Sequence, residues 1–519
     1  MNRGEMLERL RERREPWDLL IIGGGATGVA IALDAASRGY QAALVERRDF
    51  GKGTSSRSTK LVHGGVRYLE QGNVPLVMEA LKERGLLKEN APHLVGELAF
   101  IVPNYEWWEA PFYGVGLRLY DLLAGKYGFG ASRNLSREET LERLPTIRTE
   151  GLRGGVVYYD GQFDDTRLLM HMAMTAAEQG AALANYCPAV ALELDGAGMA
   201  AGVRVRDEES GGEFSLKARA VINATGPFSD EIRRMADPGA APMVAPSQGV
   251  HLVFDASYLP RGAAIMVPHT RDGRVMFAIP WHGHTLVGTT DTPLETVSEE
   301  PAAFAHEIDF ILETAGQYLS HAPSRADVLS VWAGIRPLVR APGASSTAAL
   351  SRDHSIHVDR NGLLTIAGGK WTTARKMAED CVDQAALLAG LEERACVTKR
   401  LRIHGYHHHA AKYGPRSVYG SDAIAIEDLI RAQPETGARL DPELPYVEAE
   451  VVWAARWEMA RTVEDVLARR TRALVLNARA ARRMAPRTAA LLARELGRSS
   501  AWEHEQVKMF DALARTYQA

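Results

Sequence analysis

The hydrophobic positions near the N-terminus change from one period to another within a short stretch. Leu19 to Ile22 form a continuous apolar run, which is typical of a strand buried on both faces of a parallel sheet. Residues 26–39 ("ATGVAIALDAASRG") then show the spacing of a helix that ends at Gly39. Another apolar run, over residues 41–46 ("QAALVE"), predicts the next strand. The pattern therefore predicts a strand, a helix and a second, parallel strand in succession.

Three glycines occupy the turn between the first predicted strand and the helix. Gly23, Gly25 and Gly28 have the spacing G-x-G-x-x-G. The first permits the tight bend, the second lets the backbone approach a pyrophosphate, and the third allows close packing of helix and strand. Glu46 ends the second strand, eighteen residues after Gly28, where an acid would hydrogen-bond a ribose hydroxyl. The unit predicts a dinucleotide site and leaves FAD and NAD as alternatives.

Later segments differ in their hydrophobic period. Residues 220–226 ("AVINATG") are an apolar strand that runs into small residues, and residues 363–390 read as a strand, a Gly-Gly turn and an amphipathic helix. Alternating runs such as residues 275–281 ("VMFAIPW") predict a β-rich region. Residues 446–481 have apolar positions at helical spacing and few Gly or Pro, so the C-terminal part is predicted to be helical.

Composition and charge indicate a globular protein and limit the partners it is expected to bind. The 519 residues are 46% hydrophobic and 24% charged, which suits a globular protein with a large core. A formal net charge of -4 gives no electrostatic sign of a nucleic-acid partner. Cys187, Cys381 and Cys396 are far apart, with neither metal-ligand spacing nor a paired framework. We expect an intracellular protein with no metal, and no apolar run approaches the ~20 residues that span a bilayer.

Residues 51–70 ("GKGTSSRSTKLVHGGVRYLE") have neither a helical nor a strand period. Their Gly, Ser and Thr residues suit a surface loop as well as a cradle for an anionic group. Their position favours the cradle, because they follow the expected ribose acid and no second strand-and-helix unit comes directly after them. An NAD-binding domain would continue into such a unit.

This stretch closely resembles the signature of the FAD-dependent glycerol-3-phosphate dehydrogenases, members of the D-amino-acid-oxidase-like flavoprotein superfamily. The resemblance continues in order through the first three-quarters of the chain, and more loosely beyond. The further matches are "APHLV" (91–95), "YYDGQFDDTRL" (158–168), "VINATGPFSD" (221–230), "SQGVHLVF" (247–254), "FAIPWHGHTLVGTTD" (277–291), "WAGIRPLV" (332–339), "SRDHSI" (351–356) and "TIAGGKWTTARKMAED" (365–380).

The resemblance implies an α/β fold in which a Rossmann-like FAD-binding domain is interleaved with a β-rich substrate domain, followed by a C-terminal helical domain. We assign residues 1–70, 156–240 and 351–400 to the FAD-binding domain. Residues 71–155 and 241–350 are assigned to the substrate domain, and residues 401–519 to the helical domain.

The resemblance also implies FAD as cofactor, with residues 54–60 around its pyrophosphate and flavin. The expected FAD-binding residues come from five short segments of the chain. They are Gly23, Gly25, Ala26, Thr27, Gly28, Glu46, Thr54, Ser55, Ser56, Ser58, Thr59, Lys60, His63, Gly64, Gly65, Ala224, Thr225, Gly226, Gly369, Lys370 and Thr372.

The implied reaction is oxidation of sn-glycerol 3-phosphate to dihydroxyacetone phosphate, with hydride transfer to the flavin. Arginine suits the phosphate because its planar fork matches phosphate oxygens and stays charged. His63 is the expected base, with His251 as the alternative, and Arg336 is the second expected catalytic residue. The expected substrate-binding residues are Arg67, Tyr68, His251, Arg336, Arg352 and Lys370. An arginine that serves only in a structural ion pair is the alternative for each of these arginines, above all for Arg352.

The family implies partners that the residues themselves do not reveal. A quinone is the expected electron acceptor, with a monotopic contact on the cytoplasmic face of the cell membrane and a homodimer as the expected assembly. An oxidase that uses oxygen and a non-catalytic flavin-binding protein are the alternative functions. The histidine-rich tract 404–414 is expected to be a solvated linker between domains.

Overall fold

The apolar run at residues 19–22 lies at the centre of a mixed sheet. It forms β1 (Trp17–Ile22), which pairs in parallel with β2 (Ala42–Val45) and β10 (Glu213–Asn223). The computed structural model describes all residues except 67–68, 70–71, 269, 272 and 341–352. Helix α2 (Ala26–Ser37) connects β1 to β2, so the predicted strand, helix and strand are confirmed.

The described residues place eight strands in this first sheet, in the order β17-β18-β10-β1-β2-β7, with β9 on β10 and β8 on β9. The pairs among β18, β10, β1, β2 and β7 are parallel, while β17 and the β8–β9 hairpin are antiparallel to their neighbours. The remaining strands are β7 (Ala182–Ala184), β8 (Ala189–Leu194), β9 (Ala200–Arg206), β17 (His354–Val358) and β18 (Leu364–Gly368).

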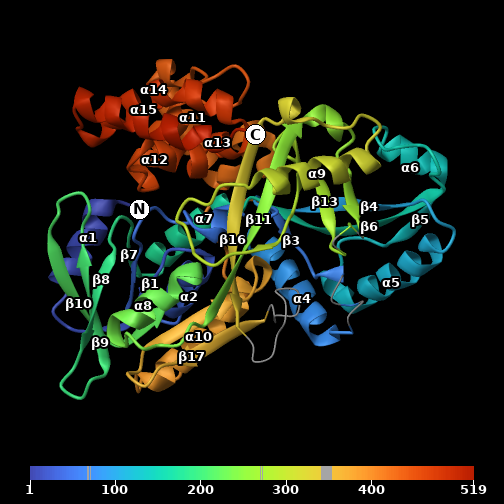
Figure 1. Ribbon diagram of the computed structural model, residues 1–519. Helices are drawn as coiled ribbons and strands as arrows, with labels where there is room; N and C mark the ends of the chain where they lie inside the picture. The colour runs from blue at the N-terminus through green and yellow to red at the C-terminus, as the bar shows by residue number, and fades with distance from the viewer. Residues whose placement is uncertain (67–68, 70–71, 269, 272, 341–352) are drawn as a thin grey trace.

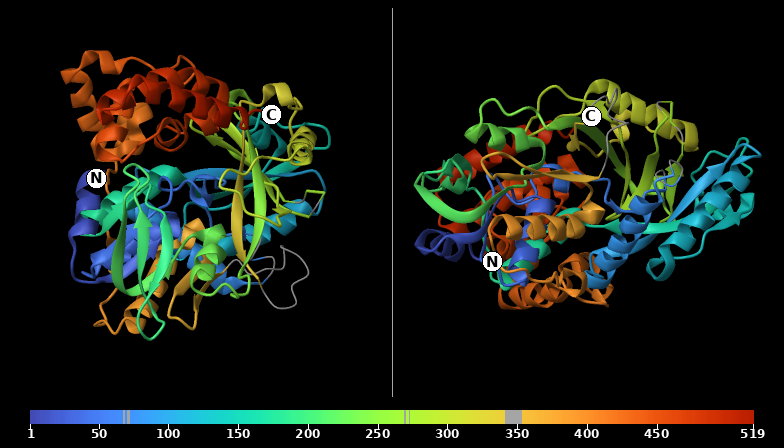
Figure 2. Two further views of the ribbon diagram at one scale, coloured as in Figure 1. Left: turned by 60° about the vertical axis from the view of Figure 1, so that its left-hand side comes forward. Right: turned by 90° about the horizontal axis from the view of Figure 1, so that it is seen from below.

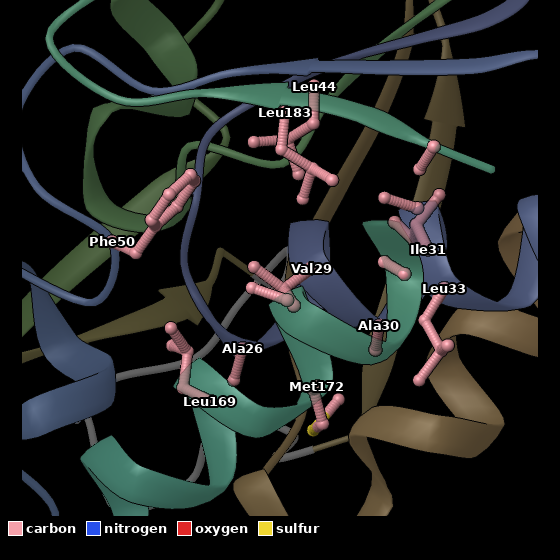
Figure 3. Close-up of a cluster of buried hydrophobic side chains, with 14 of the residues drawn as sticks. Ala26, Val29, Ala30, Ile31, Leu33, Leu44, Phe50, Leu169, Met172 and Leu183 are labelled. Carbon is pink, nitrogen blue, oxygen red and sulfur yellow. The ribbon is translucent and has the colours of Figure 1, made fainter. Parts of the chain in front are cut away.

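Helices cover both faces of the first sheet, which explains why β1 is apolar throughout. Leu19 and Ile21 face α2, α7 (Asp165–Glu178) and α10 (Ala374–Leu388). Leu20 and Ile22 face the other side, where α1 (Arg3–Glu12) and α8 (Ser229–Ala236) pack. Figure 3 shows side chains of α2 and α7 in one cluster with Leu44 and Leu183 of the neighbouring strands β2 and β7.

In the described part of the chain, a second sheet of ten strands lies beside the first (Figure 1). Its order is β15-β11-β14-β13-β12-β4-β6-β3, with β16 on β11 and β5 on β6. The strands are β3 (Leu61–Val62), β4 (Val95–Asn104), β5 (Arg133–Leu135), β6 (Gly154–Phe163), β11 (Val244–Asp255), β12 (Ala264–Val267), β13 (Met276–Trp281), β14 (His284–Gly288), β15 (Thr292–Pro293) and β16 (Ser330–Val339). The helices around it are α4 (Val74–Asn90), α5 (Glu109–Ala124), α6 (Arg137–Arg143) and α9 (Ala305–Tyr318).

The structure differs from the expected boundaries at two strands. The boundaries at residues 70 and 156 assign β3 and most of β6 to the FAD-binding part. In the structure β6 pairs with β4 along its whole length and β3 pairs with β6, so both lie in the second sheet. The reason is the ten-residue antiparallel pairing of β4 with β6, which no local pattern reveals.

The C-terminal part is helical, as predicted, and lies against both other parts (Figure 2). It contains α11 (Ala423–Ala432), α12 (Glu448–Trp457), α13 (Ala473–Leu476), α14 (Ala478–Leu496) and α15 (Ser500–Arg515). The helical pattern over 446–481 is nevertheless interrupted between α12 and α13, where Met459 and Arg472 adopt positive φ angles of 53° and 61°. Among the described residues, no helix is long and apolar enough to cross a bilayer, and no group of side chains could hold a metal ion.

Buried charges join this helical part to the first sheet. The Asp49 carboxylate accepts hydrogen bonds from Arg470 Nη1 at 2.7 Å and from Arg469 Nε at 2.5 Å. Burial alone would raise the pKa of Asp49, but the two guanidinium groups hold it well below its ordinary value. Arg167 of α7 pairs in the same way with Glu458, with a bond of 3.0 Å between Nη2 and Oε2. Breaking such a pair would leave an uncompensated buried charge.

The histidine-rich tract begins with a histidine that is held by two carboxylates. His404 lies between Glu178 of α7 and Asp422, with 2.7 Å between His404 Nε2 and Asp422 Oδ2. Burial lowers the pKa of His404, but the bonds to Asp422 and Glu178 outweigh it and raise the pKa to about 9. The beginning of the tract is therefore a charged contact between two parts of the chain, whereas His408 and His409 are exposed.

We expect the stability of the protein to fall between about pH 6.5 and pH 9 because of His404. Its pKa of about 9 in the folded state exceeds the ordinary value of 6.5, so its stabilisation is complete below pH 6.5 and lost as the pH rises through 9. Denaturant unfolding at several pH values should show a loss of up to about 3 kcal/mol over this range. His404→Gln should remove the dependence, and His409→Gln should keep it. An unchanged slope in His404→Gln would contradict the assignment.

Candidate active site

A large cavity opens where the carboxyl ends of β1, β10 and β18 meet the N-termini of α2 and α10. Its space, including the open mouth, is about 1300 Å³. Twelve of the expected FAD-binding residues line it. They are Gly23, Gly25, Ala26, Thr27, Glu46, Thr54, Ser55, Ala224, Thr225, Gly226, Gly369 and Lys370.

The glycine turn at the start of α2 has no room for side chains. Gly23 has a φ of +112°, and a Cβ atom there would lie 2.6 Å from Ala224 O. A Cβ atom on Gly28 would lie 1.9 Å from Gly23 O, although Gly28 itself does not line the cavity. Gly25 caps α2 without a side-chain hydrogen bond, and Ala26 N donates to Ser55 Oγ at 2.8 Å. The helix therefore presents its positive end to the cavity.

Glu46 lines the cavity at the end of the second strand, as the sequence predicts. Its carboxylate accepts hydrogen bonds from Gly24 N at 2.6 Å and from Arg48 N at 2.7 Å. Burial raises the pKa of Glu46, and these two backbone bonds oppose the rise. Because each carboxylate oxygen has two lone pairs, acceptor capacity remains for a ribose hydroxyl.

The stretch 54–60 divides between the cavity and the protein interior. Thr54 and Ser55 line the cavity, and Thr54 Oγ1 donates to Ile335 O of β16 at 2.5 Å. Ser58 Oγ and Lys60 Nζ both point to Asp165 Oδ2, each at 2.7 Å. Lys60 has no exposed surface. The structure thus places Ser58 and Lys60 away from the cavity, because the Asp165 carboxylate at the start of α7 draws both inward.

Expected residues 56 and 63–65 do not line the cavity. His63 is half-buried, and its backbone N–H donates to Thr372 Oγ1 at 3.2 Å. Gly64 packs against Leu81 and Tyr120, where a Cβ atom would lie 2.4 Å from the Tyr120 hydroxyl. Ser56 is buried, and Gly65 has a φ of +78°. Arg67, Tyr68 and Arg352 lie outside the described residues.

The Gly-Gly-Lys turn brings β18 to the cavity wall. Gly368 and Gly369 have φ angles of +78° and +72°, and a Cβ atom on Gly369 would lie 2.4 Å from Met377 Sδ. Lys370 and Trp371 line the cavity, and Trp371 Nε1 donates to Ser55 O at 2.9 Å. The turn therefore joins the stretch 54–60 on one wall of the cavity.

His251 and Arg336 lie on one face of the antiparallel pair β11–β16. His251 is opposite Trp332 and stacks on it, with 4.3 Å between ring centroids. Its Nε2 lies 3.0 Å from Thr59 Oγ1. Burial, followed by the charges of Arg336 and Lys60, lowers the pKa of His251 well below its ordinary value. The structure thus brings two of the expected substrate residues together and links them to the stretch 54–60.

Several residues that line the cavity were not predicted from the sequence. Arg47 and Phe228 line the cavity, with the guanidinium 4.3 Å from the ring centroid. Glu299 also lines the cavity and pairs with Arg47 and Arg48. Arg47 could have been found because it follows Glu46 directly. Glu299 has no local signal, since an acidic residue in a turn is ordinary.

These observations fit FAD. Two helix N-termini face the cavity, the glycine turns leave the backbone open to a close approach, and Glu46 lies where a ribose would be recognised. When bound, FAD would be held by these turns and by Thr54 and Ser55.

Comparison with known proteins agrees with this geometry. Residues 18–375 match the family described as FAD dependent oxidoreductase, and residues 364–504 match the C-terminal domain of alpha-glycerophosphate oxidase. The chain is 43% identical to the human mitochondrial glycerol-3-phosphate dehydrogenase over 526 residues, covering 95% of this chain and 72% of the relative. The chain belongs to the FAD-dependent glycerol-3-phosphate dehydrogenase family.

Other members of this dehydrogenase family support the same assignment. A probable mitochondrial glycerol-3-phosphate dehydrogenase from Caenorhabditis elegans is 44% identical, covering 97% of this chain and 73% of the relative. The glycerol-3-phosphate dehydrogenase of Bacillus halodurans, solved in complex with FAD, superposes with a TM-score of 0.81 at 30% identity over 100% of this chain and 98% of that one. The predicted fold class, the FAD cofactor and the assignment as an enzyme of this family are confirmed.

We expect Gly28→Ala to lose FAD, because the new methyl group would meet Gly23 O and push α2 away from the glycine turn. Overpacking of this kind costs about 1–3 kcal/mol or more, which would weaken FAD binding by about tenfold or more. The ratio of flavin to protein absorbance in the purified variant measures this loss.

Gly53→Ala is the matched control. Gly53, unlike Gly28, lines the cavity, and a Cβ atom there would meet no protein atom within 4 Å. It should retain full flavin content. Equal flavin content in the two variants would contradict the packing argument.

Proposed function

We propose that this chain oxidises sn-glycerol 3-phosphate to dihydroxyacetone phosphate in an FAD-dependent reaction and passes the electrons to a quinone. One observation carries the proposal: the stretch 54–60 touches the dinucleotide cavity through Thr54 and Ser55 and the face that bears Arg336 through Thr59 and His251. A dinucleotide site and a cationic face therefore meet along one segment. The names of the relatives support the choice of substrate.

We propose that cationic side chains of the protein bind the substrate phosphate. Arg336 is 24% exposed and tied to the protein by both Nη atoms, and Lys370 lines the cavity wall. A cationic side chain that is already held in place loses little conformational freedom when it binds a phosphate dianion. By family analogy Arg67, Tyr68 and Arg352 complete the substrate set.

His63 is proposed as the acceptor of the hydroxyl proton. Its backbone is fixed by Thr372, two residues after Lys370, and its side chain is half-buried. His251 is proposed to bind the substrate without charge, because its surroundings oppose protonation. Bound FAD supplies the chemistry of hydride acceptance. The protein groups orient the alcohol, exclude water and take up the proton.

We propose that a quinone in the membrane accepts the electrons, and that the protein reaches it by binding to the membrane surface. Helix α5 carries an apolar stripe on its outer face, at the right-hand end of the molecule in Figure 1. Phe112, Val115, Leu119 and Leu122 are 51%, 71%, 44% and 76% exposed and follow helical spacing. Trp107, just before the helix, is 74% exposed.

The charges around the α5 stripe also suit a lipid surface. Arg118 and Lys126 are exposed, whereas the carboxylates of Glu109 and Asp121 accept hydrogen bonds from backbone amides. Exposed aromatic and aliphatic side chains beside basic ones are typical of contact with a bilayer interface. A homodimer on the cytoplasmic face of the cell membrane belongs to the proposal by family analogy.

The proposed reaction predicts that sn-glycerol 3-phosphate bleaches the flavin absorbance of the anaerobic enzyme. The reduced enzyme should then be reoxidised by a soluble quinone analogue, and only slowly by oxygen, in stopped-flow measurements. Fast reoxidation by oxygen with none by the quinone would identify an oxidase. If glycerol 3-phosphate leaves the flavin oxidised, the chain is a non-catalytic flavin-binding protein and the proposal is refuted.

The proposed membrane surface predicts that Val115→Asp with Leu122→Asp abolishes binding to vesicles of phosphatidylethanolamine and phosphatidylglycerol. Each apolar side chain contributes about 1.5–3 kcal/mol when buried, so the partition should fall by about tenfold or more. Leu387→Asp, on α10 and at a residue 84% exposed, is the control and should bind normally. Sedimentation with vesicles measures the partition, and flavin bleaching should be equal in all variants. Normal binding by the double variant would exclude this face.

A further inference from the structure

Asp291 links Arg336 to a second guanidinium group. It lies just after β14, and its side chain is 5% exposed. Arg336 Nη1 lies 3.1 Å from Asp291 Oδ1, and Arg274 Nη1 lies 3.4 Å from Oδ2 and donates to Asp291 O at 2.7 Å. The Ser247 hydroxyl also donates to the Asp291 carboxylate. One carboxylate therefore holds two cations and a hydroxyl.

The remaining contacts of Arg336 fix the plane of its guanidinium group. Nη1 donates to Gln248 O at 3.3 Å, and Nη2 donates to Thr289 Oγ1 at 3.2 Å and to Thr290 O at 3.0 Å. The group also packs on Gly249, where a Cβ atom would lie 2.4 Å from Nη2. The Asp291 carboxylate is an anion, whereas Gln248, Thr289 and Thr290 offer neutral oxygens.

The charge of Asp291 by itself would oppose the binding of a phosphate. Arg336, Arg274 and Asp291 together leave one net positive charge, and removal of the carboxylate would leave two. If charge alone mattered, a neutral residue at 291 would bind anions more tightly. If position mattered more, the same change would weaken binding, because the fork of Arg336 would no longer be held. Whether phosphate affinity rises or falls in such a variant therefore decides between the charge effect and the positioning effect.

We propose that Asp291 is a positioning residue that holds Arg336, with Arg274 beside it, for recognition of the phosphate-bearing substrate. The inference rests on the proposed function, in which Arg336 contacts that substrate. Asp291 itself touches neither substrate nor cofactor in this assignment.

Asp291→Asn tests the proposal, with Asp207→Asn as the matched control. Asp207, just after β9, also holds two guanidinium groups and a hydroxyl, and it does not line the cavity. The donors are Arg3 and Arg11 of α1, at 2.7 and 3.0 Å, and Ser210, at 2.6 Å. We expect Asp291→Asn to raise the KM for glycerol 3-phosphate and the Kd of inorganic phosphate, read from the flavin spectrum, by about 10- to 100-fold. Asp207→Asn should leave both unchanged.

The double variant Asp291→Asn with Arg336→Ala gives the decisive comparison. Since Asp291 acts through Arg336, its replacement should cause little further loss once Arg336 is absent. An equal loss of phosphate affinity with and without Arg336 would overturn the proposal, as would unchanged or tighter phosphate binding by Asp291→Asn.

If Asp291→Asn does not retain FAD, Ser247→Ala takes its place in the test and should also weaken phosphate binding. Unchanged binding there would overturn the proposal.

The outcomes separate this inference from the proposed function. Flavin bleaching by glycerol 3-phosphate in the wild-type chain, together with an unaffected Asp291→Asn, would overturn the positioning role alone. Absence of bleaching in the wild-type chain would overturn the proposed function.

Discussion

The Lys60 ammonium group lies 2.7 Å from the Asp165 carboxylate, with the rings of Trp281 and Trp332 at 5.0 and 4.8 Å and no contact with solvent. Burial lowers the pKa of Lys60, while the charge of Asp165 and its hydrogen bond oppose that shift. A buried pair of this kind stabilises only when both partners are present. The pair fixes the path of residues 54–60, because Asp165 starts α7 beneath the first sheet and both tryptophans belong to the second.

That fixed path explains how a site can be shared by two sheets. Thr54 and Ser55 reach the dinucleotide cavity, and Thr59, four residues further along, reaches His251 on β11. Trp371 closes the same wall through its bond to Ser55 O. In the proposed function, a short segment of backbone would set the position of a substrate at Arg336 relative to the cofactor. Displacement of either sheet would then change that relative position.

The helical C-terminal part is joined to this assembly by buried charges as well as by shared apolar clusters. Asp49, which follows the expected ribose acid by three residues, is held by Arg469 and Arg470, and Arg167 of α7 is held by Glu458. His404 adds a charged contact between the same parts. Because Asp49 and Glu458 are both paired with guanidinium groups, Arg469 and Arg470 of this arginine-rich region serve internal pairing.

The sequence by itself determined the glycine turn, the strand-helix-strand unit around it, the Glu46 position and the helical character of the C-terminal part, because each follows from a local period or a short spacing. It also marked residues 51–70 as a cradle. Tertiary structure alone decided that Ser58 and Lys60 turn inward to Asp165, that β6 joins the second sheet, and that His251 and Arg336 share one face. An alternating pattern shows which side of a strand is buried. It does not show which distant strand will pair with it, and that pairing places these side chains.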